Sequence, residues 1–116
     1  MGTDRDRIDA YLPLRPVEFH ILLSLAAGDR HGYGIIQDIE ARDAAVPDVG
    51  TMYRALARLV EQSLIEGVRT RDATDERRIN YRITPLGTRV ARAEARRLEA
   101  LAQAARVNGL LARKAT

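Results

Sequence analysis

The chain of 116 residues is long enough for one domain, and its 46% apolar and 30% charged residues are ordinary for a globular protein. With one phenylalanine, four tyrosines and no tryptophan, the core must be aliphatic, which favours packed helices over a β-sandwich. The absence of cysteine excludes a disulfide framework and thiol chemistry.

The net charge of +3 hides a division along the chain. Residues 1–48 carry five arginines and nine acidic residues, a net of −4, whereas residues 49–116 carry fourteen basic and seven acidic residues, a net of +7. A basic second half is expected of a protein that binds a polyanion, although a solvated basic helix face gives the same count.

Residues 1–12 are charged and lack clear periodicity, which predicts an arm with at most a short helix around residues 8–12, available to a partner subunit. The N-terminus does not resemble a signal peptide, and no apolar run has transmembrane length. We therefore expect a soluble, cytoplasmic protein without a membrane partner.

A first helix is predicted from Pro16, a residue that suits a first helical turn, to a glycine cap at Gly28. It is nearly apolar all round, so we expect it to be buried. A second helix over residues 33–43 turns three isoleucines inward, and Tyr33 is interpreted as a core tyrosine. His31 has no neighbouring ligand for a metal site, so a capping role is favoured over a metal ligand or general base.

Residues 49–62 predict an amphipathic helix that follows a turn at Pro47. Gly50 and Thr51 are interpreted as its start. The two sides of the helix separate by residue type: Met52, Leu56, Leu59 and Val60 on the apolar side, and Thr51, Arg54, Arg58 and Glu61 on the polar side. The arginines predict a recognition helix, although an amphipathic helix without a binding role has the same pattern.

Two alternating segments, residues 64–71 and 79–84, predict a two-stranded hairpin with a charged tip over residues 72–78. Because an isolated hairpin is unstable in water, we expect it to pack on the helices through Ile65, Tyr81 and Ile83.

The last segment, residues 86–111, is rich in strong helix formers and predicts one long helix. A domain of this size leaves little to cover its apolar side, which predicts a dimer interface; the alternative is a helix folded back on its own domain. A membrane-surface helix is disfavoured because the apolar side is rich in alanine. The predicted interface residues are Val90, Leu98, Leu101, Ala105 and Leu111.

Four phrases in this order resemble the signatures of the PadR family of bacterial transcriptional regulators. They are His-Gly-Tyr-Gly-Ile-Ile (31–36), Gly-Thr-Met-Tyr-Arg-Ala-Leu-Ala-Arg-Leu (50–59), Leu-Ile-Glu (64–66) and Arg-Arg-Ile-Asn-Tyr-Arg-Ile-Thr-Pro-Leu-Gly (77–87). The resemblance covers roughly residues 12–112. The chain departs from it at Met52, Ser63 and Asn80, where the family often has leucine, glycine and an aromatic residue.

The resemblance implies a mainly α fold with a β-hairpin, that is, a winged helix-turn-helix, followed by a C-terminal dimerisation helix. We expect a DNA-binding domain over residues 1–84 and a dimerisation helix and tail over residues 85–116. The expected function is a homodimeric repressor that binds an inverted-repeat operator in double-stranded DNA. The expected DNA-binding residues are Thr51, Tyr53, Arg54, Arg58, Arg77 and Arg78, with Arg69, Arg71 and Arg82 as secondary candidates.

The sequence also bears on two other classes of function, an enzyme and a protein-docking module. An enzyme is disfavoured because the sequence has no catalytic constellation, metal-ligand cluster or cofactor loop, so we expect no cofactor. A winged-helix module that docks protein rather than DNA remains the alternative. Relatives can respond to phenolic acids or planar drugs, but no aromatic residue follows Tyr81. One alternative is that no effector binds. The other is an effector that is small or anionic and binds near Tyr11 and the arginines of the last helix.

Overall fold

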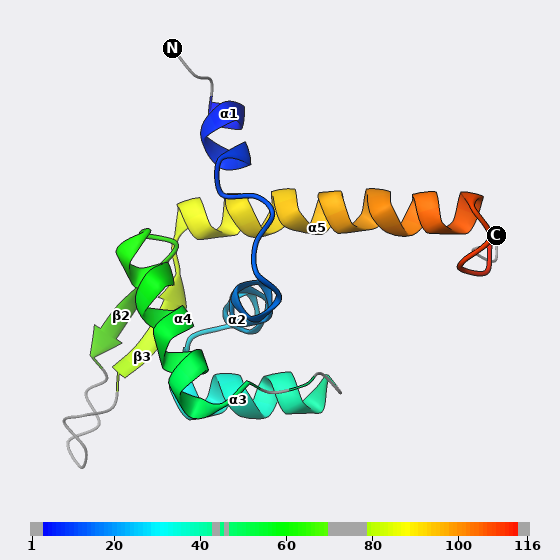
Figure 1. Ribbon diagram of the computed structural model, residues 1–116. Coiled ribbons are helices and arrows are strands. Elements are labelled where there is room, and N and C mark those ends of the chain that lie inside the picture. Colours follow the sequence, from blue (N-terminus) through cyan, green and yellow to red (C-terminus); the bar gives the residue numbers. More distant parts are fainter. Residues whose placement is uncertain (1–3, 43–44, 46, 70–78, 114–116) are drawn as a thin grey trace.

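The computed structural model describes residues 4–42, 45, 47–69 and 79–113, and confirms the predicted fold class (Figure 1). Helices and a small sheet form a winged helix-turn-helix, from which a long C-terminal helix extends. The elements are α1 (Asp4–Asp9), α2 (Pro16–Ala26), β1 (Arg30–His31), α3 (Gly32–Ala41), α4 (Val49–Glu61), β2 (Ile65–Arg69), β3 (Ile79–Ile83) and α5 (Pro85–Val107).

Helix α2 is the centre of the core, and α3, α4 and α5 pack around it (Figure 1). Its Ile21, Leu22 and Leu25 are buried, as predicted. The helix begins at Pro16, which lacks an amide hydrogen and so loses nothing in a first turn.

The sheet has three antiparallel strands in the order β1-β3-β2, not the two that were predicted. Strands β2 and β3 form the expected hairpin, with Ile65 opposite Ile83. The missed strand, β1, places Arg30 opposite Tyr81. Two residues are too few to show alternation, so only pairing with β3 reveals this strand. The predicted hairpin tip, residues 72–78, lies outside the described residues.

Helix α5 has two parts with different surroundings. Near its start, Gly87 lies so close to the carbonyl oxygen of Leu64 that a Cβ atom would stand 2.0 Å from it. Val90 is fully buried in the same core. The C-terminal half extends beyond the other elements (Figure 1). The predicted division of the chain into two domains at residues 84 and 85 stays a prediction. The start of α5 packs in the same core as the helices before it.

Helix α5 ends at Val107, so the prediction that it reaches about residue 111 is wrong. The chain leaves the helix through Gly109, whose φ of 82° favours glycine. The Leu110 amide then donates to the Ala105 carbonyl over 2.8 Å, closing a Schellman-type end.

Two predicted burials are also wrong. Tyr33 is 62% exposed rather than a core residue, and Val60 is exposed on α4. The N-terminal helix spans Asp4–Asp9 rather than residues 8–12, and Tyr11 and Leu12 pack against the chain's own core. Among the described helices, none is long and apolar enough to cross a membrane.

Candidate nucleic-acid interface

Helix α4 begins one residue before Gly50, and its cap is Asp48 rather than Thr51. The Asp48 carboxylate accepts a hydrogen bond from the Thr51 amide over 2.8 Å, which satisfies an amide that the helix itself leaves unpaired. This bond and a second from the Thr51 hydroxyl, 3.1 Å long, lower the pKa of Asp48. The sequence contained the signal, because aspartate directly before an amphipathic segment is a preferred N-cap residue.

The hydrogen bonds of the cap extend to Arg54, the exposed arginine of the first turns of α4. Thr51 donates its hydroxyl hydrogen to Asp48 and accepts a hydrogen bond from the Arg54 guanidinium over 3.1 Å. Arg54 is exposed and stays beside the first turn, close to Gly50. As predicted, Thr51 and Arg54 lie on the same side of the helix, where a guanidinium is held ready for an anionic or base-edge acceptor.

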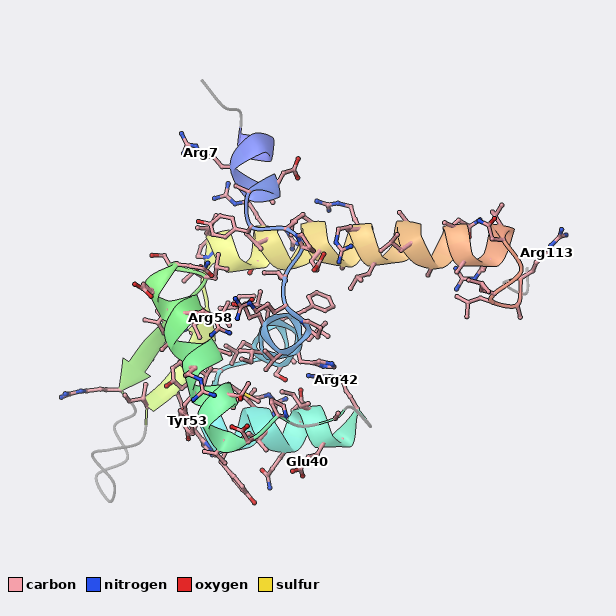
Figure 2. All side chains as sticks on the ribbon, in the orientation of Figure 1. Arg7, Glu40, Arg42, Tyr53, Arg58 and Arg113 are labelled. Atoms are coloured by element: carbon pink, nitrogen blue, oxygen red, sulfur yellow. The ribbon has the colours of Figure 1, made fainter. Side chains whose placement is uncertain are left out.

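Tyr53 joins α4 to the start of α3. Its ring lies over Gly32, where an added Cβ would be 2.9 Å from the phenol oxygen. Tyr53 nevertheless remains about half exposed (Figure 2). Next to Gly32, the exposed Tyr33 stacks on His31, with ring centroids 6.5 Å apart. Exposed tyrosines from α3 and α4 are therefore both present in the structure.

The exposed position of Tyr33 was missed, although its place on the helix indicated it. Tyr33 lies two residues before Ile35. This spacing places Tyr33 on the other side of the helix from the buried Ile35 and Ile39. The expected capping role of His31 is confirmed: its Nδ1 atom accepts a hydrogen bond from the Gly34 amide over 3.1 Å.

Arg58 is less exposed than Arg54, with 34% of its side chain accessible, and its expected contact with DNA stays a prediction. The side chain points from α4 toward α2 (Figure 2), and its Nε atom lies 3.5 Å from the carboxylate of the buried Glu18. Periodicity could not show this, because an arginine at the edge of an apolar face can turn either way and the acid lies forty residues earlier.

The wing has basic residues on its described part. Arg69 is exposed at the end of β2. Arg82 on β3 is engaged within the chain by Asp29, at 3.0 Å, and approaches Glu66 at 3.9 Å. Arg71, Arg77 and Arg78 lie outside the described residues.

The C-terminal half of α5 presents an apolar surface. Leu98 and Leu101 are exposed, Leu101 to 55%, and Ala105 is partly buried. Leu111 is exposed but follows the helix rather than belonging to it. The assignment of Val90 to this surface is wrong, because its side chain is wholly enclosed by its own domain.

No cluster of three potential metal ligands occurs within residues 4–42, 45, 47–69 and 79–113. The exposed groups of the site are hydroxyls and a guanidinium, which suit hydrogen bonding to phosphate oxygens and base edges.

Comparison with known proteins identifies relatives of this arrangement. The sequence model of the "Transcriptional regulator PadR-like family" matches residues 21–93. A transcriptional regulator from Clostridium thermocellum is similar in structure, with a TM-score of 0.65, 28% identity, and coverage of 89% of this chain and 94% of that one. No curated protein matches the sequence.

Two further solved structures show the same fold. One is a PadR family transcription regulator from Clostridium difficile, with a TM-score of 0.70, 23% identity, and coverage of 77% of this chain and 93% of that one. The other is a PadR-like transcription factor from Bacteroides fragilis, with a TM-score of 0.69, 20% identity, and coverage of 92% and 95%.

Proposed function

Since the chain belongs to the PadR-like family of transcriptional regulators, we propose that it is a homodimeric repressor that binds an inverted-repeat operator in double-stranded DNA. Two copies of α4 enter successive major grooves on one side of the duplex. Arg54 reads base edges, Thr51 and Tyr53 contact phosphates near the helix start, and Arg77 and Arg78 contact the DNA backbone beside the wing.

The exposed first turns of α4 carry this proposal. Thr51, Tyr53 and Arg54 come from one capped helix start, and the same helix buries its apolar side on α2. A rigid helix with a guanidinium oriented by its own neighbour is suited to bidentate recognition of guanine. The exposed leucines at 98 and 101 support assembly of two copies.

Arg54→Ala tests the proposal on a duplex selected by the native protein from a randomised pool. We expect a loss of about 1 to 3 kcal/mol in affinity for the selected sequence and a smaller loss on unselected DNA. Arg113→Ala is the control, because it removes the same charge at the far end of the molecule (Figure 2). Equal binding by Arg54→Ala and native protein, or no enrichment of any sequence, would contradict the proposal.

Salt dependence separates this function from a winged-helix module that docks protein. Displaced counterions make DNA affinity fall steeply with salt, and Arg77→Ala or Arg78→Ala should each lower the slope of log affinity against log salt by about one. A shallow slope for the native protein would favour the docking module.

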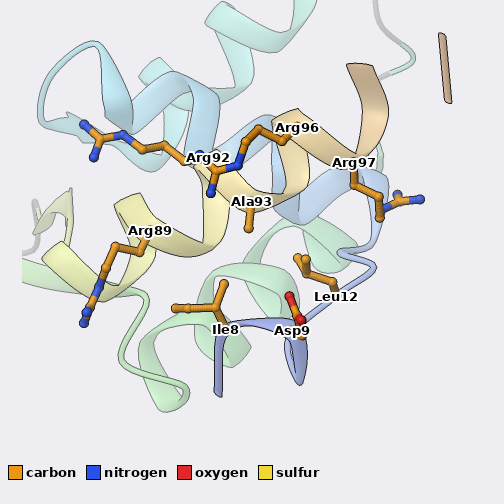
Figure 3. Close-up of a pocket in the computed structure, with 8 residues that line it drawn as sticks. All are labelled: Ile8, Asp9, Leu12, Arg89, Arg92, Ala93, Arg96 and Arg97. Atoms are coloured by element: carbon orange, nitrogen blue, oxygen red, sulfur yellow. The ribbon is translucent and has the colours of Figure 1, made fainter. Parts of the chain in front are cut away.

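A cavity supports the further proposal of a small anionic effector. It has a volume of about 880 Å³, lies between α1 and α5, and receives four arginines from α5 (Figure 3). The lining residues are Ile8, Asp9, Leu12, Arg89, Arg92, Ala93, Arg96 and Arg97. Tyr11 is not among them, and none of these described lining residues offers an aromatic face to a planar cation.

Titration of phenolic acids and planar dyes against the protein–DNA complex tests this effector. We expect an anion to release DNA, and planar cations to bind more weakly than about 100 μM because no aromatic face stacks on them. Arg92→Ala should weaken the response to the anion, whereas Arg113→Ala should not. Release of DNA by a planar cation at low micromolar concentration would contradict the proposal.

A further inference from the structure

Two acidic residues, Glu18 and Glu94, are buried in the centre of the molecule, with exposures of 6% and 1%. Burying a carboxylate is costly unless it is paired and hydrogen-bonded, and glutamate is seldom buried otherwise. Neither residue lies on the exposed face of α4 or in a metal-ligand cluster among the described residues. Their contacts therefore indicate a different role.

Glu18 joins α2 to α4. One carboxylate oxygen accepts a hydrogen bond from the Arg15 amide over 3.3 Å, and the other lies 3.5 Å from Nε of Arg58. That Nε atom is shielded from solvent and has no hydrogen-bond partner within the described residues. Glu18 therefore supplies the compensating charge for the inward side of Arg58.

Glu94 joins α5 to the segment that precedes α2. Its Oε2 atom accepts a hydrogen bond from the Leu14 amide over 2.7 Å, and its Oε1 atom accepts one from Arg97. The bond from Arg97, with help from the Leu14 amide, lowers the pKa of Glu94 despite its burial. The group is thus a carboxylate at neutral pH, able to hold both donors.

The two carboxylates accept hydrogen bonds from consecutive amides, those of Leu14 and Arg15. Glu94 belongs to α5, and the partner of Glu18 belongs to α4. Helix α2 packs on both α4 and α5 (Figure 1), so one connection between the two runs through α2 and the residues just before it. A second connection runs through Leu64, which follows α4 and whose carbonyl oxygen packs against Gly87 of α5. Glu18 and Glu94 belong to the first connection, which contributes to the orientation of α4 relative to α5.

We propose that Glu18 and Glu94 are positioning residues for DNA recognition, and that Arg58 acts through Glu18 rather than by touching DNA. The proposal rests on the proposed function as a dimeric DNA-binding protein. In a dimer formed through α5, the orientation of α4 relative to α5 sets the separation of the two recognition helices, and so the spacing of half-sites that is bound.

A double-mutant cycle on the selected duplex tests the role of Arg58. Glu18→Gln and Arg58→Gln should each lower the affinity of the folded protein, and the double variant should bind no worse than the weaker single variant, because both changes break one interaction. The slope of affinity against salt should stay unchanged, since no phosphate contact is lost. Glu99→Gln, on an exposed part of α5, is the matched control.

Loss of affinity in Arg58→Gln with no loss in Glu18→Gln, or a salt slope lowered by about one in Arg58→Gln, would show that Arg58 contacts DNA and would overturn the proposal. If Glu18→Gln does not fold, Glu18→Asp replaces it in the cycle. It keeps the negative charge but its shorter side chain draws the carboxylate away from Arg58. Weaker binding with an unchanged salt slope is expected, whereas native binding would contradict the positioning role.

Half-site spacing tests the role of Glu94. The native protein should prefer one spacing in a series of duplexes that differ by single base pairs. Glu94→Gln should flatten this preference by roughly tenfold or more while leaving binding to a single half-site unchanged. An unaltered preference in a folded, dimeric variant would overturn the role of Glu94.

Hydrogen exchange of the free protein separates failure of this inference from failure of the proposed function. The Leu14 amide should exchange faster in Glu94→Gln, and the amides of α4 should exchange faster in Glu18→Gln. If the native protein bound no duplex but these changes appeared, the proposed function alone would fail. Unchanged exchange at both places would overturn the inference itself.

Discussion

Helices α4 and α5 are both amphipathic and both begin at a side-chain cap, Asp48 in one and Thr84 in the other, but they differ in what covers their apolar side. Met52, Leu56 and Leu59 of α4 are fully enclosed by the same chain. The C-terminal half of α5 leaves Leu98 and Leu101 exposed. An amphipathic pattern thus predicts a helix with a partner surface, but does not say whether that surface lies in the same chain.

The sharpest test of this difference removes one leucine from each helix. Leu56→Ala should lower the free energy of unfolding by about 2 to 5 kcal/mol, because it leaves a cavity in a closed core. Leu101→Ala should leave the fold of a single subunit intact and weaken only its association. Denaturant unfolding, repeated at several protein concentrations, measures both effects. Equal, concentration-independent losses would show that α5 is covered within its own chain.

A substitution in the first turn of α5 should lower the stability of the single subunit, as one in α4 does, because this turn is packed within its own chain. Gly87→Ala puts a methyl group against the Leu64 carbonyl oxygen and should cost about 3 kcal/mol, since a backbone atom cannot move aside cheaply. Gly34→Ala in α3 is the control, because its added Cβ meets only ordinary contacts at 3.6 Å or more. Thermal unfolding should show a loss for the first variant alone.

Leu101→Arg tests whether the exposed half of α5 is covered by a second copy of the chain. If two copies associate through α5, an unpaired charge enters an apolar interface, and association should weaken by at least about tenfold. Sedimentation at micromolar concentration should then detect monomers with unchanged helix content. A variant that remains fully dimeric would place the main contact elsewhere.

The smallest expected change in stability comes from substituting Ser63, which lies between α4 and α5 in the chain. Its φ of 62° is a left-handed conformation that costs energy for a residue with a Cβ atom. Ser63→Gly should therefore stabilise the protein by about 0.5 to 1 kcal/mol without changing DNA affinity. Denaturant midpoints against the Ser63→Ala control measure this gain, and equal midpoints would mean that the strain is absent.

Much of the fold could be predicted because its signals are local. Pro16 marked the start of the first helix, the alternation around Tyr81 marked a strand, and the four motif phrases indicated the winged helix. The candidate site was predicted as far as Thr51 and Arg54 share one side of α4, where their side chains are hydrogen-bonded. Tyr53 is exposed on a different side, with its ring over Gly32 of α3. Arg77 and Arg78 lie outside the described residues, and their role stays a proposal.

Several features depend on residues far apart in the chain, and the sequence alone did not predict them. The two-residue strand at Arg30 forms only because β3 lies beside it, and Val90 is buried because α5 packs on α2.

The sequence by itself determined most of the helices and strands and their apolar sides, β1 and the bounds of α1 excepted, because caps, glycines and periodicity act over a few residues. Tertiary structure decided where the charged side chains go. Arg58 turns inward because α2 brings Glu18 within 3.5 Å, whereas Arg54, four residues earlier, stays outside with Thr51. Both are arginines on one helix, and the packing of a distant carboxylate gives them different surroundings.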